Sequence, residues 1–503
     1  MIQLPGSYVT PSNSDSARVN KKACKEKDAF GRPPGEVKGS QPHAGLRLVN
    51  WYITMAKLCQ DKTMRKIFVL GSGGREHAIT WALRATSSEQ LELTCTPGNA
   101  GIGHVAELTN IGLEPHEELA SFAEVKEFDL TFVGPEAPLA AGIVDFFEAR
   151  GLPIVGPTSA AARLEGSKTF AKEFMARHGV PTAAFRTAES PSEAVVHLRS
   201  GEFGSSESPV VIKADGLAAG KGVVVAANRA EAERAIEDLM IHHAAGKEAA
   251  QRVVIEETLV GREASLLLFA DGRDFALMPA ARDHKRIGEN DTGPNTGGMG
   301  TITDASVLDE SVLQRVVREI VEPTLAGARD EGFPFKGILF LGLMLTKDGP
   351  KLLEYNVRFG DPETQAILVR LKTSLVEIFE AMHRGTLANV KVEWAGGASA
   401  CVVAANRGYP GKYESGAEIE GLETVAENSE VQVFHAGTSW APNGKLIANG
   451  GRVLGVTSAA ADLPAALDLC YGALEKIHWP GMQFRHDIGR DPISPISNAE
   501  GVR

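Results

Sequence analysis

The sequence predicts a multidomain α/β protein whose first domain is doubly wound. Strand-like and helix-like runs alternate along the chain from Ile67 onward, which is the pattern of a layered α/β fold. The chain has 503 residues, of which 43% are hydrophobic and 23% charged, so it is long enough for about three or four globular domains. Two segments interrupt the alternation, a glycine-rich hairpin and a polar strand end, and both predict function.

The opening domain follows from a strand, a tight turn and a helix. Ile67–Leu70 is predicted as a strand, Gly71–Gly74 as a turn and Glu76–Ala85 as a helix. Further buried strands are predicted at Leu91–Cys95, Leu130–Val133 and Ile154–Val155. A dinucleotide fingerprint would need glycine at Glu76 and an acidic residue after the second strand, so binding of NAD is disfavoured. The free N–H groups of the helix start can hold another anion, or the segment is only a tight turn.

Residues 1–63 are predicted to be mostly disordered. They hold ten Lys and Arg against five Asp and Glu, five scattered prolines, and no sustained periodicity before a short apolar stretch near Leu48–Leu58. A continuous hydrophobic signal segment is missing, and interspersed acids disfavour a transit peptide. An upstream start assigned in error is the simplest account, and a regulatory extension is the alternative.

The glycine-rich hairpin lies in Val210–Val225, between two β-branched runs. A Walker A loop is rejected because Gly216 and Gly220 are one residue too close, Gly222 follows the lysine where a hydroxyl is needed, and a strand rather than a helix comes next. Glycines still let backbone N–H groups approach phosphates closely, and Lys213 would add a positive charge. An ordinary hairpin with a solvated lysine is the alternative.

The polar strand end lies in Leu352–Gln365. Glu354, Asn356 and Arg358 are two residues apart, so they share one face of a strand. A carboxylate and an amide oxygen suit Mg²⁺, which usually takes only one or two protein ligands, and arginine suits a phosphate oxygen. The turn Gly360–Glu363 adds two further carboxylates. An exposed strand face with assorted polar residues is the alternative.

Composition excludes several classes of function. The formal net charge of −12 argues against nucleic-acid binding by bulk electrostatics. No stretch approaches the roughly 20 apolar residues that a membrane span requires. Five scattered cysteines predict neither a disulfide framework nor a zinc site and fit a reducing cytoplasm.

Several motifs occur in an order that resembles one family. The chain is similar to the ATP-grasp fold and, within it, to the phosphoribosylamine–glycine ligase (glycinamide ribonucleotide synthetase) family, from about Met64 to Gly489. Each motif alone is a weak signal, but their order is specific. The motifs are GSGGREHA, PGNAG, VGPEAPL, LEGSKTFAK, IKADGLAAGKGV, IEETLVGREAS, DHKRIGENDTGPNTGGMG, LEYNVRFGDPETQ, VFHAGT and NGGRVLGV.

The resemblance implies a domain order. Residues 64–165 would form the doubly wound N-terminal domain, residues 166–184 and 257–388 the ATP-grasp core, and residues 185–256 its small lid. Residues 389–490 would form an α+β C-terminal domain, and residues 491–503 a tail. One departure from the wider ATP-grasp pattern is that Gly337–Leu345 contains no acid, which leaves the number of metal ions open.

The resemblance also implies roles for individual residues. Metal ligands are expected at Glu354 and Asn356. Phosphoryl transfer is assigned to Arg358, Lys213, Lys285 and Arg286. ATP contacts are expected at Lys168, Lys213, Gly216, Gly220, Gly222, Glu256, Glu257, Leu259 and Glu263. The other substrates would contact Gly73, Gly74, Arg75, Glu76, Asn99, Pro135, Glu136, Asp291, Asn295, Gly297 and Gly298. His284 receives no role, because a lone histidine is more often a structural hydrogen-bonding group.

The implied function is a cytoplasmic, monomeric enzyme of purine biosynthesis. It would use ATP with Mg²⁺ or Mn²⁺ to join glycine to 5-phosphoribosylamine, through glycyl phosphate, with neither nucleic acid nor membrane as a partner. The lid would exclude water from the acyl phosphate. Another ATP-grasp carboxylate–amine ligase is the nearer alternative, and a nonenzymatic ATP sensor is the remoter one.

Overall fold

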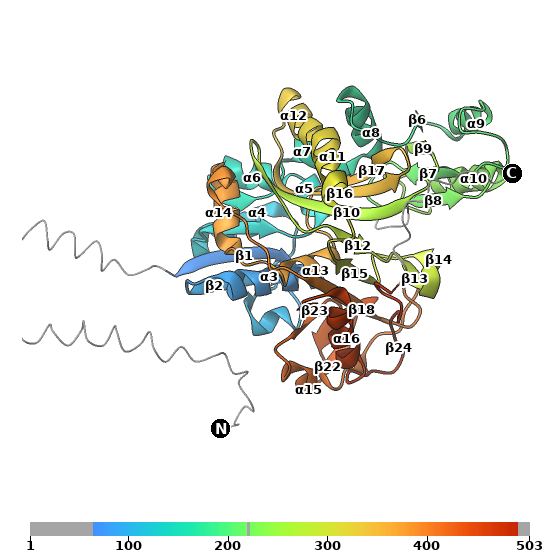
Figure 1. Cartoon of the computed structure of the whole chain (residues 1–503). Helices are drawn as coiled ribbons and strands as arrows, with labels where there is room; N and C mark the ends of the chain where they lie inside the picture. Colours follow the sequence, from blue (N-terminus) through green and yellow to red (C-terminus); the bar gives the residue numbers. More distant parts are fainter. Residues whose placement is uncertain (1–63, 219–221, 491–503) are drawn as a thin grey trace, which may run out of the picture. The chain divides into compact units, whose positions relative to one another are not determined.

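The computed structural model describes residues 64–218 and 222–490. The predictions for residues 1–63, the tail 491–503 and Gly220 therefore fall outside the described residues. Within them, the predicted multidomain α/β class is confirmed: a parallel sheet, a long antiparallel sheet and a small antiparallel sheet are covered by helices (Figure 1).

The N-terminal region is a parallel sheet with strand order β3-β2-β1-β4-β5. Its central strand β1 (Arg65–Gly71) buries alternate side chains in two different cores, as a parallel strand covered on both faces should. The other strands are β2 (Leu91–Pro97), β3 (Glu107–Leu108), β4 (Leu130–Val133) and β5 (Ile154–Val155). The helices are α3 (Gly74–Thr86), α4 (His116–Lys126), α5 (Glu136–Ala140) and α6 (Ile143–Ala149).

The first helix begins two residues earlier than its pattern predicts, and β2 ends two residues later. The Glu76 carboxylate accepts a hydrogen bond from Gly73 N–H at 2.6 Å, so the helix starts at Gly74. The chain adds β2 and β3 on one side of β1 and then β4 and β5 on the other side, so the ends of β1 and β4 form a topological switch point. Open α/β sheets bind ligands at such points.

A small antiparallel sheet follows, with strand order β6-β9-β7-β8. Its strands are β6 (Phe185–Ala188), β7 (Val210–Ala214), β8 (Val223–Ala226) and β9 (Val253–Glu257). Helices α9 (Pro191–Arg199) and α10 (Arg229–Ile236) pack on it and enclose a separate apolar core (Figure 1). The β-branched runs on either side of the glycine loop thus pair as the predicted hairpin.

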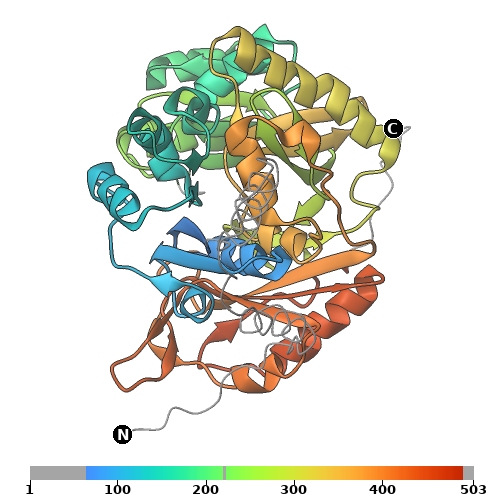
Figure 2. The same ribbon diagram turned by 90° about the vertical axis from the view of Figure 1, so that its left-hand side faces the viewer.

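The long sheet has the order β17-β16-β10-β12-β15-β18-β23-β20. Its strands are β10 (Arg262–Asp271), β12 (Ala281–Asp283), β15 (Gly300–Thr303), β16 (Lys336–Thr346), β17 (Gly349–Asn356), β18 (Ala398–Asn406), β20 (Val431–His435) and β23 (Arg452–Ala460). Strands β11 (Phe275–Leu277) and β24 (Met482–Gln483) pair at its margins. Because β15 pairs with β18, the sheet continues from the ATP-grasp region into the C-terminal region (Figures 1 and 2).

Helices cover this sheet along its length. They are α7 (Ser159–Gly166), α8 (Lys168–Arg177), α11 (Glu310–Val316), α12 (Glu322–Asp330), α14 (Leu375–Arg384), α15 (Leu422–Ala426) and α16 (Leu463–Leu474). Two smaller sheets pair β13 (Arg286–Gly288) with β14 (Thr292–Asn295), and β22 (Leu446–Ala448) with both β19 (Ala417–Glu418) and β21 (Thr438–Trp440). Figure 2 shows α16 along the C-terminal strands, against which it packs.

Helix α13 (Glu363–Leu368) lies where the parts of the molecule meet. All six of its residues are buried, and it packs against α3 and against strands β12, β15, β18 and β23. The predicted turn Gly360–Glu363 leads directly into it. Residues of this turn are therefore placed within reach of three regions of the chain.

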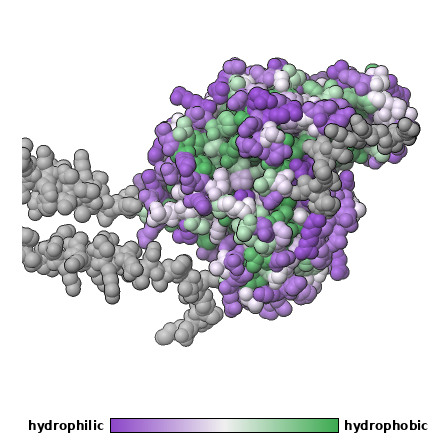
Figure 3. Space-filling view, viewed as in Figure 1, coloured by the Kyte–Doolittle hydropathy of each residue, from purple (hydrophilic) through white to green (hydrophobic). Residues whose placement is uncertain are grey.

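The face seen in Figure 3 is mostly hydrophilic, with hydrophobic residues in separate patches. Among residues 64–218 and 222–490, no helix is long and apolar enough to cross a bilayer.

Candidate active site

The site is built around Glu354 on β17. A β-bulge immediately precedes it, because Gly342 of β16 pairs with Glu354 while Leu343 pairs with Leu352. Beyond the bulge the two-residue period holds, and Tyr355 and Val357 are buried on the opposite side. Glu354, Asn356 and Arg358 therefore share a face as predicted, and Arg358 Nη2 lies 3.4 Å from Asn356 Oδ1.

Four of the predicted cations act on Glu354. Burial raises the pKa of this carboxyl, but Lys285, Lys213, Lys168 and Arg358 outweigh burial and lower it below its usual value. Glu354 is thus held ionised, in the state that a metal ligand needs. Residues from four separate motifs converge at this one carboxylate.

Arg358 is clamped by two carboxylates. Its Nε lies 3.2 Å from Glu136 Oε2 and its Nη2 lies 3.0 Å from Glu165 Oε1. Burial disfavours the guanidinium charge, but the two acids raise its pKa. Glu136 and Glu165 differ, because burial leaves the pKa of Glu165 raised whereas Arg358 and Arg75 bring that of Glu136 below normal.

Lys213, on β7, belongs to a buried ion triad. Its Nζ lies 2.9 Å from Glu256 Oε1, and Lys172 Nζ lies 3.2 Å from Glu256 Oε2. Burial lowers the pKa of Lys172 to about 8, although Glu256 opposes the shift. The Glu256 side chain is 2% exposed, so its carboxylate is committed to the two lysines. The predicted ATP contact of Glu256 through its backbone stays a prediction.

The glycine loop is tied to the start of α8. Asp215 accepts hydrogen bonds from Thr169 N–H at 2.7 Å and from Ser167 Oγ at 2.9 Å, and Lys168 Nζ donates to Gly216 O at 3.1 Å. A Cβ at Gly216 would lie 2.8 Å from Ala249 Cα, and one at Gly222 would lie 2.7 Å from the Ala218 side chain. Both glycines are therefore required by close packing, and their approach to phosphate stays a prediction.

The returning strand β9 leads to the predicted adenine-binding segment. Glu257 accepts from Ala184 N–H at 2.9 Å and from Lys351 Nζ at 3.1 Å, and Leu259 lies between β9 and β10. Glu263, predicted for the ribose, pairs with Lys285 at 2.9 Å. Burial opposes the charge of Lys285, but Glu263 and Glu354 raise its pKa.

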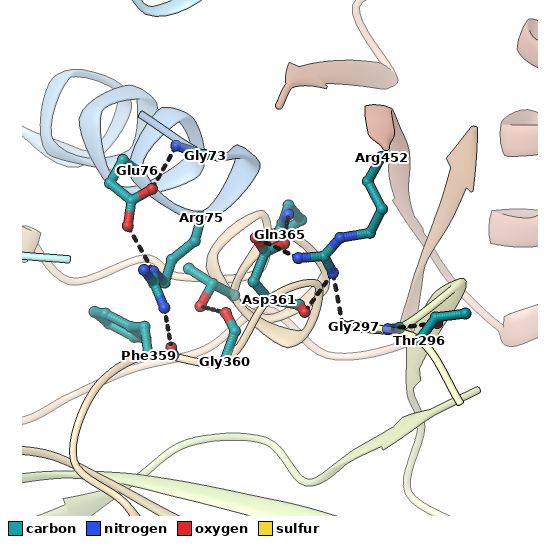
Figure 4. Close-up of polar contacts among 12 residues, drawn as sticks. Gly73, Arg75, Glu76, Thr296, Gly297, Phe359, Gly360, Asp361, Gln365 and Arg452 are labelled. Carbon is teal, nitrogen blue, oxygen red and sulfur yellow. Dashed lines mark hydrogen bonds and ion pairs between the residues drawn. The ribbon is translucent and has the colours of Figure 1, made fainter. Parts of the chain in front are cut away.

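Many polar groups at the Gly71–Glu76 turn are already hydrogen-bonded to other groups of the protein. Glu76 Oε1 accepts from Arg75 Nε at 2.6 Å, and Arg75 Nη1 donates to Phe359 O at 3.2 Å (Figure 4). The Asn99 amide donates to Ser72 O and His435 O and accepts from Gly101 and Ile102 N–H. Because both groups of that amide are occupied, Asn99 shapes the turn. Its substrate contact, and those of Gly73, Gly74 and Pro135, stay predictions.

The segment 283–300 is more ordered than a permissive loop. The glycines of Asp291–Gly300 predict a permissive loop, but Thr292–Asn295 forms β14 and pairs with β13. Arg286 Nη1 donates to Gly293 O at 2.6 Å within this hairpin, and the Asp291 carboxylate pairs with Arg485 at 2.7 Å. Asn295 is exposed and pairs with Arg286 across the hairpin.

His284 is buried beside this segment as a neutral ring. Burial, assisted by Arg282, lowers its pKa to about 4. Its Nδ1 lies 3.1 Å from Gly300 O and its Nε2 3.2 Å from Gly489 N. A carbonyl can only accept and an amide can only donate, so the proton resides on Nδ1. These contacts match a structural hydrogen-bonding group.

Several residues of the site were missed from the sequence. Lys172, Glu165 and Arg452 each lie within a motif that was recognised, but no spacing distinguishes them from surface residues. Asp283 and Glu363 are neighbouring carboxyls. Burial raises the pKa of both, Glu363 raises that of Asp283 further, and Asp361 raises that of Glu363. The sequence does offer a hint for both: Asp283 stands beside the basic run His284–Arg286, and Glu363 belongs to the Gly360–Glu363 turn.

The described residues offer two hard oxygen ligands but not a complete metal cage. Within residues 64–218 and 222–490, no three His, Cys, Asp or Glu side chains gather in a way that would hold a metal ion. Glu354 and Asn356 would suit Mg²⁺, which usually takes only one or two protein ligands and completes its shell with water and nucleotide phosphate. The donor set therefore fits a metal shared with a nucleotide.

Three family models cover almost all of the described chain. The phosphoribosylglycinamide synthetase N domain matches residues 65–165, its ATP-grasp (A) domain residues 166–364, and its C domain residues 399–491. The phosphoribosylamine–glycine ligase of Caldanaerobacter subterraneus subsp. tengcongensis is 46% identical over 84% of this chain and 99% of its own length. That of Pseudomonas aeruginosa is 47% identical over 85% and 98%.

A solved structure gives the same result. The crystal structure of phosphoribosylamine–glycine ligase from Thermotoga maritima matches with a TM-score of 0.72 at 36% identity, over 84% of this chain and 99% of that one. The fold and the cation-lined carboxylate define an ATP-grasp protein. The chain belongs to the phosphoribosylglycinamide synthetase, or phosphoribosylamine–glycine ligase, family.

Proposed function

We propose that this chain joins glycine to 5-phosphoribosylamine at the expense of ATP, giving glycinamide ribonucleotide, ADP and phosphate in purine biosynthesis. The observation that carries the proposal is the convergence of Lys168, Lys213, Lys285 and Arg358 on the ionised Glu354. These cations are suited to the phosphates of a nucleotide that binds between the glycine hairpin and β17. The matches over all three family models, and the named relatives, support these substrates.

The chemistry needs an activated carboxylate. An oxygen of the glycine carboxylate attacks the γ-phosphorus of ATP, the bond to ADP breaks, and glycyl phosphate forms. The amine of phosphoribosylamine then attacks the acyl carbon, the carbon–oxygen bond to phosphate breaks, and the amine loses a proton to the phosphate or to solvent. Lys213, Lys285 and Arg358 offset the charge on the transferred phosphoryl oxygens.

Other parts of the chain would support these steps. Glu354 and Asn356 would hold Mg²⁺ or Mn²⁺, which supplies positive charge to the nucleotide phosphates. The small β6–β9 sheet would exclude water from the acyl phosphate. The switch point at Gly73–Glu76 and Pro135–Glu136 would bind the phosphoribosyl group. We also propose a monomer that works in the cytoplasm, consistent with buried free thiols at Cys95, Cys401 and Cys470.

An ADP-release assay tests the proposal. Release should require both glycine and phosphoribosylamine when each is omitted in turn, and the product should have the mass of glycinamide ribonucleotide. Glycine-dependent exchange of labelled ADP into ATP, without the amine, would detect glycyl phosphate. Release that depends on another amino acid, but not on glycine, would identify a different carboxylate–amine ligase and contradict the proposal.

A further inference from the structure

Residues of the C-terminal region hold both backbone groups of Gly297. Its N–H donates to Tyr409 Oη at 2.9 Å, and its carbonyl accepts from Arg452 Nη1 at 2.6 Å. Arg452, on β23, also donates to Asp361 O at 2.7 Å and to Asp361 Oδ2 at 3.0 Å (Figure 4). The guanidinium of Arg452 thus joins Gly297 to the Gly360–Glu363 turn, which leads into α13.

The C-terminal region also holds the turn of the β13–β14 hairpin. Arg485, 1% exposed, donates to Arg286 O at 3.1 Å and to Asp291 Oδ1 at 2.7 Å, and it forms two bonds of 2.7 Å with Asp487. Asp487 in turn accepts from Asn290 N–H at 2.8 Å. The β13–β14 hairpin and the residues that follow it are therefore fixed at two places: the turn between the two strands, and Gly297.

The hairpin needs such support. It has two short strands, and all four residues of β14 are exposed. A two-stranded hairpin without a covered face is only marginally stable in water. Gly298 also has φ +111°, which a chain of L residues rarely adopts. The conformation of the hairpin is therefore set by the contacts made at its turn and at Gly297.

The segment Thr296–Gly298, which follows β14, is connected directly to site residues. Thr296 N–H donates to Lys285 O at 2.7 Å, so the backbone of Lys285 moves with this segment. A Cβ at Gly298 would lie 2.7 Å from Asp283 Oδ1. A shift of Gly297 would therefore move Lys285, whose charge acts on Glu354, and would also displace the Asp283 carboxyl.

We propose that Tyr409 and Arg452 are positioning residues that set the Thr296–Gly298 backbone for glycine. The inference rests on the proposed function and takes glycine as the substrate that binds at Gly297 and Gly298, which the family resemblance assigns to substrate binding. Neither Tyr409 nor Arg452 needs to contact glycine. Each acts by fixing one backbone group of Gly297, so the C-terminal region takes part in amino-acid binding although it holds none of the ATP residues.

Tyr409→Phe tests the inference by removing one oxygen atom. Amide hydrogen exchange in a peptide spanning Thr296–Gly300 should become faster by roughly five-fold, the contribution of one typical hydrogen bond. The KM for glycine should rise by a similar factor, while kcat and the KM for ATP stay within about two-fold. Tyr413→Phe is the matched control, because Tyr413 is 42% exposed in the same region.

Arg452 provides the second arm. Arg452→Met should raise the KM for glycine by roughly ten-fold or more, as expected for a charge-assisted hydrogen bond. Arg452→Lys should recover part of this loss by pairing with Asp361, but a single ammonium cannot reproduce the fork that reaches both Asp361 and Gly297.

The outcomes separate the two proposals. Unchanged exchange in Tyr409→Phe, or an unchanged KM for glycine, overturns the inference even if the ligase activity is established. An equal loss for glycine and ATP also overturns it, because a general structural role would produce that result. Wild-type turnover that does not require glycine contradicts the proposed function, and the exchange measurement alone then decides whether Tyr409 holds the hairpin.

Discussion

Replacing Lys172 with methionine should stabilise the protein at pH 7, whereas replacing Glu256 with glutamine should destabilise it. The two side chains belong to one ion triad with Lys213, and Lys172 and Glu256 are each 2% exposed. Lys213 still faces Glu256 at 2.9 Å when Lys172 is removed. Removal of Glu256 instead leaves two buried ammonium groups without an anion. The two changes therefore have opposite signs.

The magnitude follows from the pKa of Lys172. Burial, the largest influence, lowers this pKa from 10.5 to about 8 in spite of Glu256. At about 1.4 kcal/mol per pKa unit, the charged lysine costs the folded state about 3 kcal/mol at pH 7. Methionine avoids this cost but loses the 2.6 Å hydrogen bond to Thr182 Oγ1, worth about 1 kcal/mol. The expected net gain is about 2 kcal/mol.

The gain should depend on pH. Between about pH 8 and pH 10.5 the unfolded chain binds the Lys172 proton and the folded chain does not, so the contribution of this group to wild-type stability rises with pH. Near pH 10.5 the advantage of Lys172→Met should therefore vanish. Glu256→Gln should lose about 3 to 5 kcal/mol at pH 7, the usual effect of leaving buried charge unpaired.

Melting temperatures without nucleotide test these signs. At about 2.1 cal/mol/K of unfolding entropy per residue, a unit of roughly 400 residues shifts by about 1 °C per kcal/mol, so Lys172→Met should melt about 2 °C higher at pH 7. Lys372→Met, at an exposed lysine, is the control and should change little at either pH. The reasoning fails if Lys172→Met melts lower than wild type by the same amount at pH 7 and pH 10.

Three further predictions concern the site and the chain start. Glu354→Gln removes a charge but keeps the shape, so turnover with saturating Mg²⁺ should fall by roughly 100-fold or more with an unchanged melting temperature; near wild-type turnover would contradict its role as a ligand. Gly222→Val places a side chain 2.7 Å from that of Ala218, so calorimetric titration should show much weaker nucleotide binding and unchanged binding of a stable phosphoribosyl analogue; equal losses would mean a general structural effect. A chain that begins at Met64 should melt and turn over like the full chain, and a drop of several degrees would show that residues 1–63 pack.

The sequence predicted local features well where one physical rule dominates. The buried strand Leu130–Val133 has the predicted ends. Glu354, Asn356 and Arg358 share a face because the period of two continues past the bulge and past the end of β17. The glycine hairpin is flanked by paired strands because both flanks are β-branched. These features depend on residues close in sequence.

Other features depend on partners that are distant in sequence. No pattern in Thr292–Asn295 predicts a strand, because its pairing with β13 is supported by Arg485 and Asp487 nearly 200 residues away. The Glu76 carboxylate caps α3 and pairs with Arg75, which its place in the sequence does not reveal. Its substrate contact stays a prediction. Acids such as Glu165 and Glu136 could not be assigned to Arg358 without the fold, since ion-pair partners leave no spacing signal.

The ion pairs explain why a cation-rich site is compatible with a stable fold. Arg358 is balanced by Glu136 and Glu165, Lys285 by Glu263, and Lys213 by Glu256. Each cation is therefore held in place without a ligand, and burial does not leave it uncompensated.

The same balance means that the site presents little excess positive charge to an arbitrary anion. A nucleotide whose phosphates are partly neutralised by a divalent ion suits such a site better than a free polyphosphate does, and Glu354 and Asn356 lie where that ion would be shared. Preorganised cations that cost little to hold are also what stabilisation of a transferring phosphoryl group requires, because no reorganisation is needed as charge develops.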